Sequence, residues 1–146
     1  MIKMLKKEIK MAADFLLKLN LKGKDSVHRM RVVKVLQEQH KLFADEELEL
    51  LKSFAELDEN GELVQAEGGG FKLVGDKKEF KKQQQELLEE IFVLEGKNLE
   101  PALKTLEEVM MDYNKELSES DAVAHFLWIQ AFELANENNK NRGDDE

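Results

Sequence analysis

The chain has 146 residues, a formal net charge of −9, 42% hydrophobic residues and no cysteine. A chain of this length and apolar content can bury a core, which argues against disorder, and the missing cysteines exclude disulfides, thiolate nucleophiles and thiolate metal sites. Charged residues make up 36% of the chain and proline occurs once, a composition that favours helices.

Long apolar runs are missing from the sequence. None approaches the roughly 20 residues that a membrane-spanning helix needs, and the N-terminus lacks the apolar segment of a signal peptide. We therefore expect a soluble intracellular product with no membrane span.

The charge is divided unevenly along the chain. Residues 1–41 hold eleven Lys and Arg against four Asp and Glu, whereas the remainder holds eleven against 27. We expect the basic helices to pack beside the acidic ones, with charges facing solvent or each other. An acidic partner is the alternative, but nucleic acid is not expected, because the basic segment has one aromatic residue, Phe15, and no Gly-rich phosphate loop.

The first expected element is an amphipathic basic helix from about Ile2 to Leu19, packed on the helix that follows. Gly23 should end it, because glycine readily adopts the positive φ of a reversal. Apolar residues then recur at spacings of three and four from Asp25 to Leu57, where Asn60-Gly61 is a stop signal. This long helix is expected either to be unbroken, within an elongated helical hairpin, or to break near Ala44-Asp45-Glu46.

Three cations lie in the first turns of the long helix. Arg31 and Lys34 are three residues apart and should share a face, with Arg29 close by. Such a group can contact an anion or an acidic partner, although acidic residues of the same fold would satisfy it equally well.

Residues 59–76 differ in character from the helices. Glu62–Gln65 and Phe71–Val74 are expected to form short strands joined by the loop Ala66–Gly70, as an inserted β-hairpin. Ile91–Leu94 is the candidate for a third strand.

Oxygen-bearing side chains from Glu56 to Glu67 follow the spacing of an EF-hand calcium loop, with Gly61 at the sixth position. However, the first position is Glu where Asp is typical, and three glycines replace the helix that should follow the last. We therefore predict a plain turn and hairpin, and no metal site.

Three more helices are expected. Asp76 should cap the first, Asn98 the second, with Pro101 in its first turn, and Ser118 the third. The last helix is apolar on nearly its whole circumference from Ala122 to Ala135, so it is predicted to be the central core helix. The alternative is that part of it forms a subunit or partner interface, with these candidates: Val123, Leu127, Trp128 and Phe132.

No catalytic constellation is found. The histidines His28, His40 and His125 lie far apart without a ligand spacing. The acidic runs are expected to be solvated helix faces: Glu46/Glu47/Glu49, Glu86/Glu89/Glu90 and Glu107/Glu108. We expect no enzymatic activity, no catalytic residues and no cofactor.

Several short motifs carry a family resemblance. They are Leu21-x-Gly23-x-x-Ser26-x-x-Arg29-x-Arg31, Phe54-Ala55-x-x-Asp58-Glu59-Asn60-Gly61, the helix after Phe80, and Leu117-Ser118-x-x-Asp121. With them the chain resembles a family of small phage and prophage proteins of unknown function from Gram-positive bacteria. Such genes commonly lie among tail and lysis genes, which implies a phage context but no activity.

The sequence thus predicts a mainly α fold, an antiparallel helical bundle or elongated helical hairpin with a small inserted β-hairpin at about 59–76. One domain is expected over residues 1–138, followed by a polar, frayed tail over 139–146. The functional hypothesis is a phage-encoded protein-binding accessory in virion structure or assembly, binding a phage or host protein or itself. It would act in the bacterial cytoplasm or on the virion. The alternative is an acidic inhibitor of a host enzyme or defence system, including a mimic of DNA.

Overall fold

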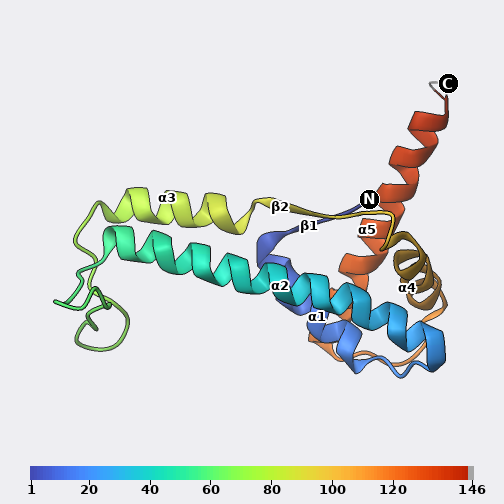
Figure 1. Ribbon diagram of the computed structural model, residues 1–146, viewed down its shortest axis with the longest axis horizontal. Helices are drawn as coiled ribbons and strands as arrows, with labels where there is room; N and C mark the ends of the chain where they lie inside the picture. Colours follow the sequence, from blue (N-terminus) through green and yellow to red (C-terminus); the bar gives the residue numbers. More distant parts are fainter. Residues whose placement is uncertain (145–146) are drawn as a thin grey trace. The chain divides into compact units, whose positions relative to one another are not determined.

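The computed structural model describes residues 1–144. It is mainly α-helical, as the sequence predicts, and has a small two-stranded antiparallel sheet (Figure 1). In chain order, the elements are β1 (Ile2–Leu5), a 3₁₀ turn (Lys6–Glu8), α1 (Ile9–Lys18), α2 (Gly23–Phe54), α3 (Lys77–Leu88), β2 (Ile91–Leu94), α4 (Glu100–Asp112) and α5 (Glu119–Asp144).

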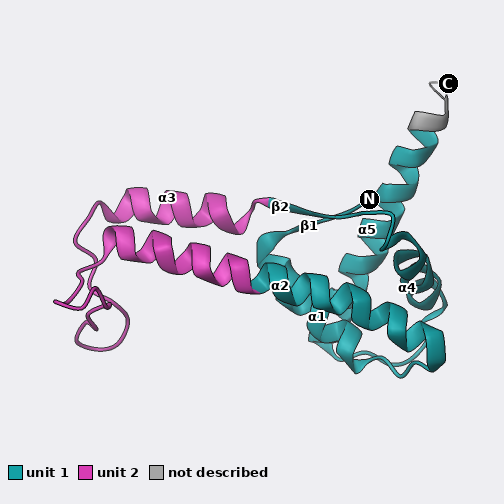
Figure 2. Cartoon of the chain, viewed as in Figure 1, with its two compact units in different colours: residues 1–40, 91–146 teal, residues 41–90 magenta. Residues whose placement is uncertain are grey.

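The chain divides into two compact units, whereas the sequence led us to expect one domain over residues 1–138. Unit 1 comprises residues 1–40 and 91–146, and unit 2 comprises residues 41–90 (Figure 2). Helix α2 contributes to both and is unbroken from Gly23 to Phe54, so the alternative with a break near Ala44 is wrong. No Gly or Pro interrupts residues 24–54, and the backbone hydrogen bonds can therefore continue.

Unit 1 begins with a strand where a helix was expected. Ile2–Leu5 pairs antiparallel with Ile91–Leu94, with Ile2 opposite Leu94 and Leu5 opposite Ile91. Ile2 and Met4 point into the core while Lys3 is exposed, which is the two-residue alternation of a strand. The predicted helix from Ile2 is therefore wrong for its first seven residues, and α1 begins only at Ile9.

Helix α5 is the centre of unit 1, and contacts α1, α4 and β1. Ser118 caps it as predicted, because its Oγ accepts a hydrogen bond from Asp121 N at 3.3 Å. The expected frayed tail is helical instead as far as Asp144, and residues 145–146 lie outside the described part of the chain. The core of unit 1 gathers apolar side chains from α1, α2, α4, α5 and both strands. The largest of those that are fully buried are Trp128, Ile9, Leu16, Leu36, Leu94, Leu106 and Met110.

Unit 2 is a helical hairpin. The second half of α2 runs beside α3, and the rings of Phe54 and Phe80 meet at 5.6 Å between centroids (Figure 2). Asp76 caps α3 as predicted, with its Oδ1 accepting from Lys78 N at 2.9 Å and from Glu79 N at 3.3 Å.

Residues 54–75 join the two helices of unit 2 through a closed arrangement that we call the triangular cap. Glu56 N donates to Lys72 O at 2.8 Å, Lys72 N to Val64 O at 3.1 Å, and Val64 N to Glu56 O at 3.1 Å. These three residues are eight positions apart, and each links one short extended segment to the next. The cap is therefore a pseudo-threefold ring of backbone hydrogen bonds.

The expected hairpin forms one side of this cap, where Gln65 bridges Phe71. The third segment of the cap is Ala55–Leu57, in which Ala55 bridges Leu73 and Leu57 bridges Leu63. Ile91–Leu94, the expected third strand, is not part of the cap. Because Ala55–Leu57 pairs in this way, α2 ends at Phe54, before the predicted Leu57.

Candidate protein-binding groove

The residues predicted as a partner interface lie on α5, but three of the four are in the core. Trp128 is 0% exposed, and Leu127 and Phe132 are also buried, whereas Val123 is on the surface. Leu127, Trp128 and Phe132 thus pack within unit 1, which agrees with the core role predicted for this helix and corrects the interface alternative for these three residues. The reason is that α5 is covered by α1, α4 and β1 on this side.

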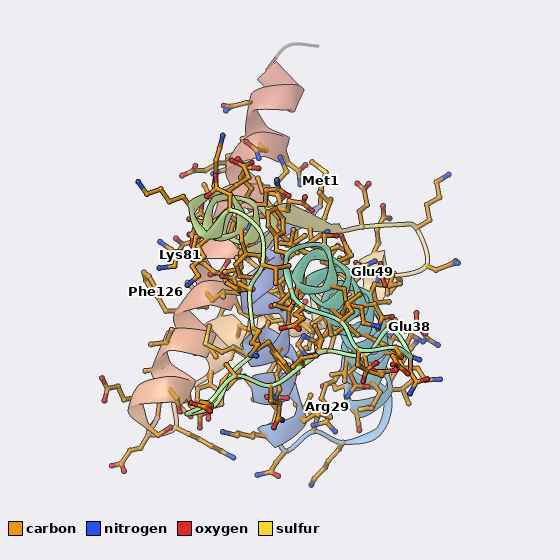
Figure 3. The ribbon with its side chains drawn as sticks, turned by 90° about the vertical axis from the view of Figure 1, so that its left-hand side faces the viewer. Met1, Arg29, Glu38, Glu49, Lys81 and Phe126 are labelled. Carbon is orange, nitrogen blue, oxygen red and sulfur yellow. The ribbon has the colours of Figure 1, made fainter. Side chains whose placement is uncertain are left out.

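The exposed side of α5 carries other apolar residues. Phe126 is 59% exposed and projects outward, and Leu134 is equally exposed further along (Figure 3). The sequence could not separate them from their buried neighbours, because the helix is apolar all round.

Arg29 does not belong to a partner-binding group. Its Nη1 donates to Leu16 O and Leu19 O at the end of α1, and its Nη2 donates to Ser26 Oγ at 3.0 Å. A guanidinium satisfies the last carbonyls of a helix well, because these oxygens are the negative end of the helix dipole. Arg29 therefore joins α1 to α2 within unit 1.

Arg31 and Lys34 are both exposed on α2, on one face as predicted. Together they line two adjoining hollows of about 530 and 350 Å³. Val27 is 51% exposed and Met30 39% exposed beside them. We call Val27, Met30, Arg31 and Lys34 the basic apolar patch. Glu38 also lines the larger hollow.

A groove of about 740 Å³ lies in unit 2, between α2 and α3. We call it the acidic groove. Its apolar part consists of Leu42, Leu50 and Leu87, and Leu42 is 53% exposed. Six carboxylates and one lysine surround these leucines. The charged residues are Asp45, Glu46, Glu49, Glu79, Glu86, Glu90 and Lys82.

The groove is strongly negative because acidic residues share one face of each helix. Asp45 and Glu46 lie four and three positions before Glu49 on α2, and Glu79 and Glu86 lie seven positions, or two turns, apart on α3. Glu79 Oε1 accepts from Gln83 Nε2 at 3.0 Å. The side chains of Asp45, Glu49 and Glu86 form no ion pair with any residue of the described range 1–144. Unit 2 as a whole has fourteen Asp and Glu against seven Lys. A cation or a basic segment would therefore be attracted to this groove.

The two sides of the hairpin differ chemically. A second hollow of about 320 Å³ is lined by Ala44, Leu48, Leu51 and Phe80 with one acid, Glu47. In Figure 3 Glu49 and Lys81 project from opposite sides of the helix pair, and Lys81 lines neither hollow. The negative charge is thus concentrated on the groove side. Sequence reasoning treated the same acids as solvated faces, since it could not show that the two runs face each other.

A third surface of unit 1 is basic but internally paired. Lys10 Nζ lies 2.6 Å from Asp14 Oδ2, and Lys18 Nζ lies 2.8 Å from Asp121 Oδ1. The hydrogen bond and charge of Asp121 raise the pKa of Lys18, and the hydrogen bond from Lys18 lowers the pKa of Asp121. This pair links α1 to the start of α5.

The three histidines remain apart. His28 is buried, with Nδ1 2.7 Å from Thr105 Oγ1, and His125 Nε2 lies 2.9 Å from Met110 O. His40 Nδ1 is buried without a hydrogen-bond partner among residues 1–144. Within that range no group of three His, Cys, Asp or Glu side chains is placed to hold a metal ion.

The EF-hand-like segment is part of the triangular cap. Asp58 Oδ1 accepts from Asn60 N at 2.8 Å and from Glu62 N at 3.0 Å, which fixes a tight turn. After Glu67 the chain turns through Gly68, Gly69 and Gly70, all with positive φ, and does not enter a helix. The turn predicted for this segment is confirmed, whereas the predicted hairpin is reduced to the single bridge between Gln65 and Phe71, without regular strands.

None of the helices in the described residues combines the length and apolar character needed to cross a membrane. Comparison with protein-family models, with curated proteins and with solved structures finds no significant match to this chain.

Proposed function

We propose that this chain is a non-catalytic, protein-binding accessory encoded by a phage, which acts in virion structure or assembly and holds its partner in the acidic groove. The observation that supports protein binding is the groove itself, in which the exposed Leu42 lies beside Asp45, Glu49 and Glu86, three carboxylates without an ion pair in the described range 1–144. The phage context and the location, on the virion or in the host cytoplasm, come from the family resemblance.

The chemistry of the groove favours a helical, basic partner. Two roughly antiparallel helices leave a furrow that an amphipathic helix can fill with its apolar face, a common mode of protein recognition. Leu42 would gain most from such contact, because half of its surface is now exposed to water. Lys or Arg at the margins of the bound helix would meet Asp45, Glu49 and Glu86.

Site-specific photo-crosslinking tests this function. A photoreactive amino acid replaces Leu42 in the groove or, as a control, Val74, which is exposed in the triangular cap and does not line the groove. During phage production, the Leu42 position should crosslink to one defined protein, and the Glu49→Lys/Glu86→Lys variant should lose that product. Equal products from both positions would contradict a specific site.

Mass spectrometry of purified virions and of the infected-cell lysate then separates the roles. Stoichiometric presence in the particle would make the chain a structural component. Abundance in the lysate with absence from the virion would leave an assembly factor or a host-directed protein.

The alternative function is an acidic inhibitor of a host enzyme or defence system. The observation that favours it is the excess of carboxylates in unit 2, with six of them around one groove. Carboxylates arranged along a surface can replace phosphates in a nucleic-acid-binding site. If the crosslinked partner were a host protein and duplex DNA displaced the chain from it, this alternative would replace the first.

A further inference from the structure

We infer that the acidic groove is filled by the basic apolar patch of a second copy of this chain, so that the protein associates with itself through these two surfaces. The inference rests on the proposed function, because it names the partner of the same groove. It depends on charge and apolar complementarity between two surfaces, one in each unit.

The charges on the two surfaces are opposite and available. Among residues 1–144, neither Arg31 nor Lys34 has a hydrogen bond or an ion pair through its side chain. In the groove, the side chains of Asp45, Glu49 and Glu86 likewise have no hydrogen bond or ion pair within this range. Lys82 is the one cation among the residues that line the groove. Opposite charges of this kind direct association and fix its orientation.

Other basic surfaces of the chain fit the groove less well. Lys10 and Lys18 also lie around a hollow, but each is already paired with a carboxylate of its own unit. Moving either lysine into a groove would break an existing ion pair. The patch with Arg31 and Lys34 therefore complements the groove better than the surface around Lys10 and Lys18 does.

The apolar parts of the two surfaces also match. Val27 and Met30 line the same hollow as the cations of the patch, and Leu42 lies among the carboxylates of the groove. All three are more than a third exposed. Contact between them would remove apolar surface from water on both sides, which supplies affinity that charge pairs at a rim do not.

Two different surfaces meet in this contact, which determines the possible assemblies. If two chains exchange patch and groove reciprocally, the result is a closed dimer with twofold symmetry. If each chain uses its patch on one neighbour and its groove on another, the result is a ring or an open chain. Both assemblies depend on the same residues.

Charge reversal of the full-length chain tests the inference. The patch variant is Arg31→Glu/Lys34→Glu and the groove variant is Glu49→Lys/Glu86→Lys. Sedimentation velocity over a concentration series at low salt should show association of the native chain. Each variant should weaken this association by about tenfold or more, because two charge pairs become repulsive. An equimolar mixture of the two variants should restore association, because the intact groove of one meets the intact patch of the other.

Matched controls carry the same charge changes elsewhere. Lys78→Glu/Lys81→Glu and Glu62→Lys/Glu67→Lys lie in unit 2 but line neither the groove nor the patch. Both should associate like the native chain. Circular dichroism should show that every variant is folded. Where a charge reversal prevents folding, the same residue of the patch or groove (Arg31, Lys34, Glu49 or Glu86) is replaced by Gln instead.

The inference is overturned if the native chain stays monomeric at low salt, if neither reversal weakens association, or if the mixture fails to restore it. A monomeric chain whose Leu42 position still crosslinks to a different protein would overturn the inference alone and leave the proposed function standing. A monomeric chain with no specific crosslink at Leu42 would overturn both.

Discussion

The indole Nε1 of Trp128 on α5 donates a hydrogen bond to the backbone carbonyl oxygen of Ala12 on α1, at 3.2 Å. The indole is completely buried and stacks on Phe132, with 5.8 Å between ring centroids. A single side chain thus supplies both apolar packing and a directional link between two helices that are more than 100 residues apart in sequence.

Trp128 is therefore expected to govern the stability of unit 1. Trp128→Phe should lower the free energy of unfolding by about 1–3 kcal/mol, because it loses a hydrogen bond and leaves a small cavity. Trp128→Asp should unfold unit 1, because a buried carboxylate would have no partner there. Urea denaturation followed by circular dichroism measures both effects. A folded Trp128→Asp variant that changed only in oligomer mass would indicate an interface instead.

Arg29 and Arg31 should differ in their effect on stability although they are two residues apart. Arg29→Met should cost about 2 kcal/mol, because it leaves the last carbonyls of α1 without their charged donor. Arg29→Lys should recover little of this, since one ammonium cannot reproduce the fork of donors. Arg31→Met, the matched control, should be within about 0.5 kcal/mol of the native chain by urea denaturation. Equal losses at both positions would contradict the assignment of Arg29.

His28 and His40 offer a second matched pair. His28→Leu should destabilise the chain by about 1–3 kcal/mol, because the partly buried Thr105 hydroxyl loses its partner. His40→Leu should be neutral or stabilising, because it removes a buried nitrogen that has no partner in the described chain. The two variants are compared by thermal unfolding. A large loss at His40 would show that its nitrogen is satisfied, for example by water.

The ion pair of Lys18 and Asp121 should make stability depend on pH at both extremes. The pKa of Asp121 is lowered from 3.8, so its contribution is present above that value and is lost as the pH falls through the lowered pKa. The pKa of Lys18 is raised from 10.5, so its contribution is present below that value and is lost as the pH rises through the raised pKa. The pair should therefore contribute over the whole neutral range.

Lys18→Met measures this contribution. Its difference in melting temperature from the native chain should be constant between about pH 5 and pH 9 and should shrink towards pH 2. High salt should reduce it at every pH, because Lys18 is solvent-exposed and Asp121 is partly exposed. Lys22→Met, a change at an exposed lysine in the loop before α2, is the control for a lost positive charge. A difference that stayed constant down to pH 2 would argue against the pair.

Local chemistry predicted several features of the fold correctly. The caps at Asp76 and Ser118 depend on one side chain and the nearest backbone amides, so the sequence contains all that is needed. The strand Ile2–Leu5 depends instead on Ile91–Leu94, 89 residues away. Ile2, Leu5 and Ile9 fit a helical period as well as Ile2 and Met4 fit a strand, and only the distant pairing decides between them.

The candidate site shows the same limit. The sequence predicted that Glu46, Glu49 and Glu86 would be on helix surfaces, and they are. The acidic residues of α2 and those of α3 line one groove because the two helices turn these faces towards each other in unit 2. Arg29 was grouped with Arg31 because the two are close in sequence. In the fold, the carbonyl oxygens at the end of α1 accept hydrogen bonds from Arg29 and not from Arg31.

The triangular cap should open as one cooperative unit when its ring of backbone hydrogen bonds is cut. Val64→Pro removes the amide that donates to Glu56 O, and the two remaining bonds of the ring then lose the segment that holds them in place. Hydrogen exchange measured by NMR should become faster at the amides of Glu56 and Lys72, while the buried amides of α5 keep their protection. Val64→Ala keeps the amide and should leave exchange in the ring close to native. If Val64→Pro accelerated exchange only at its immediate neighbours, the three segments would be independent turns. The pairing of residues eight positions apart predicts a shared response, because each segment is held by the other two.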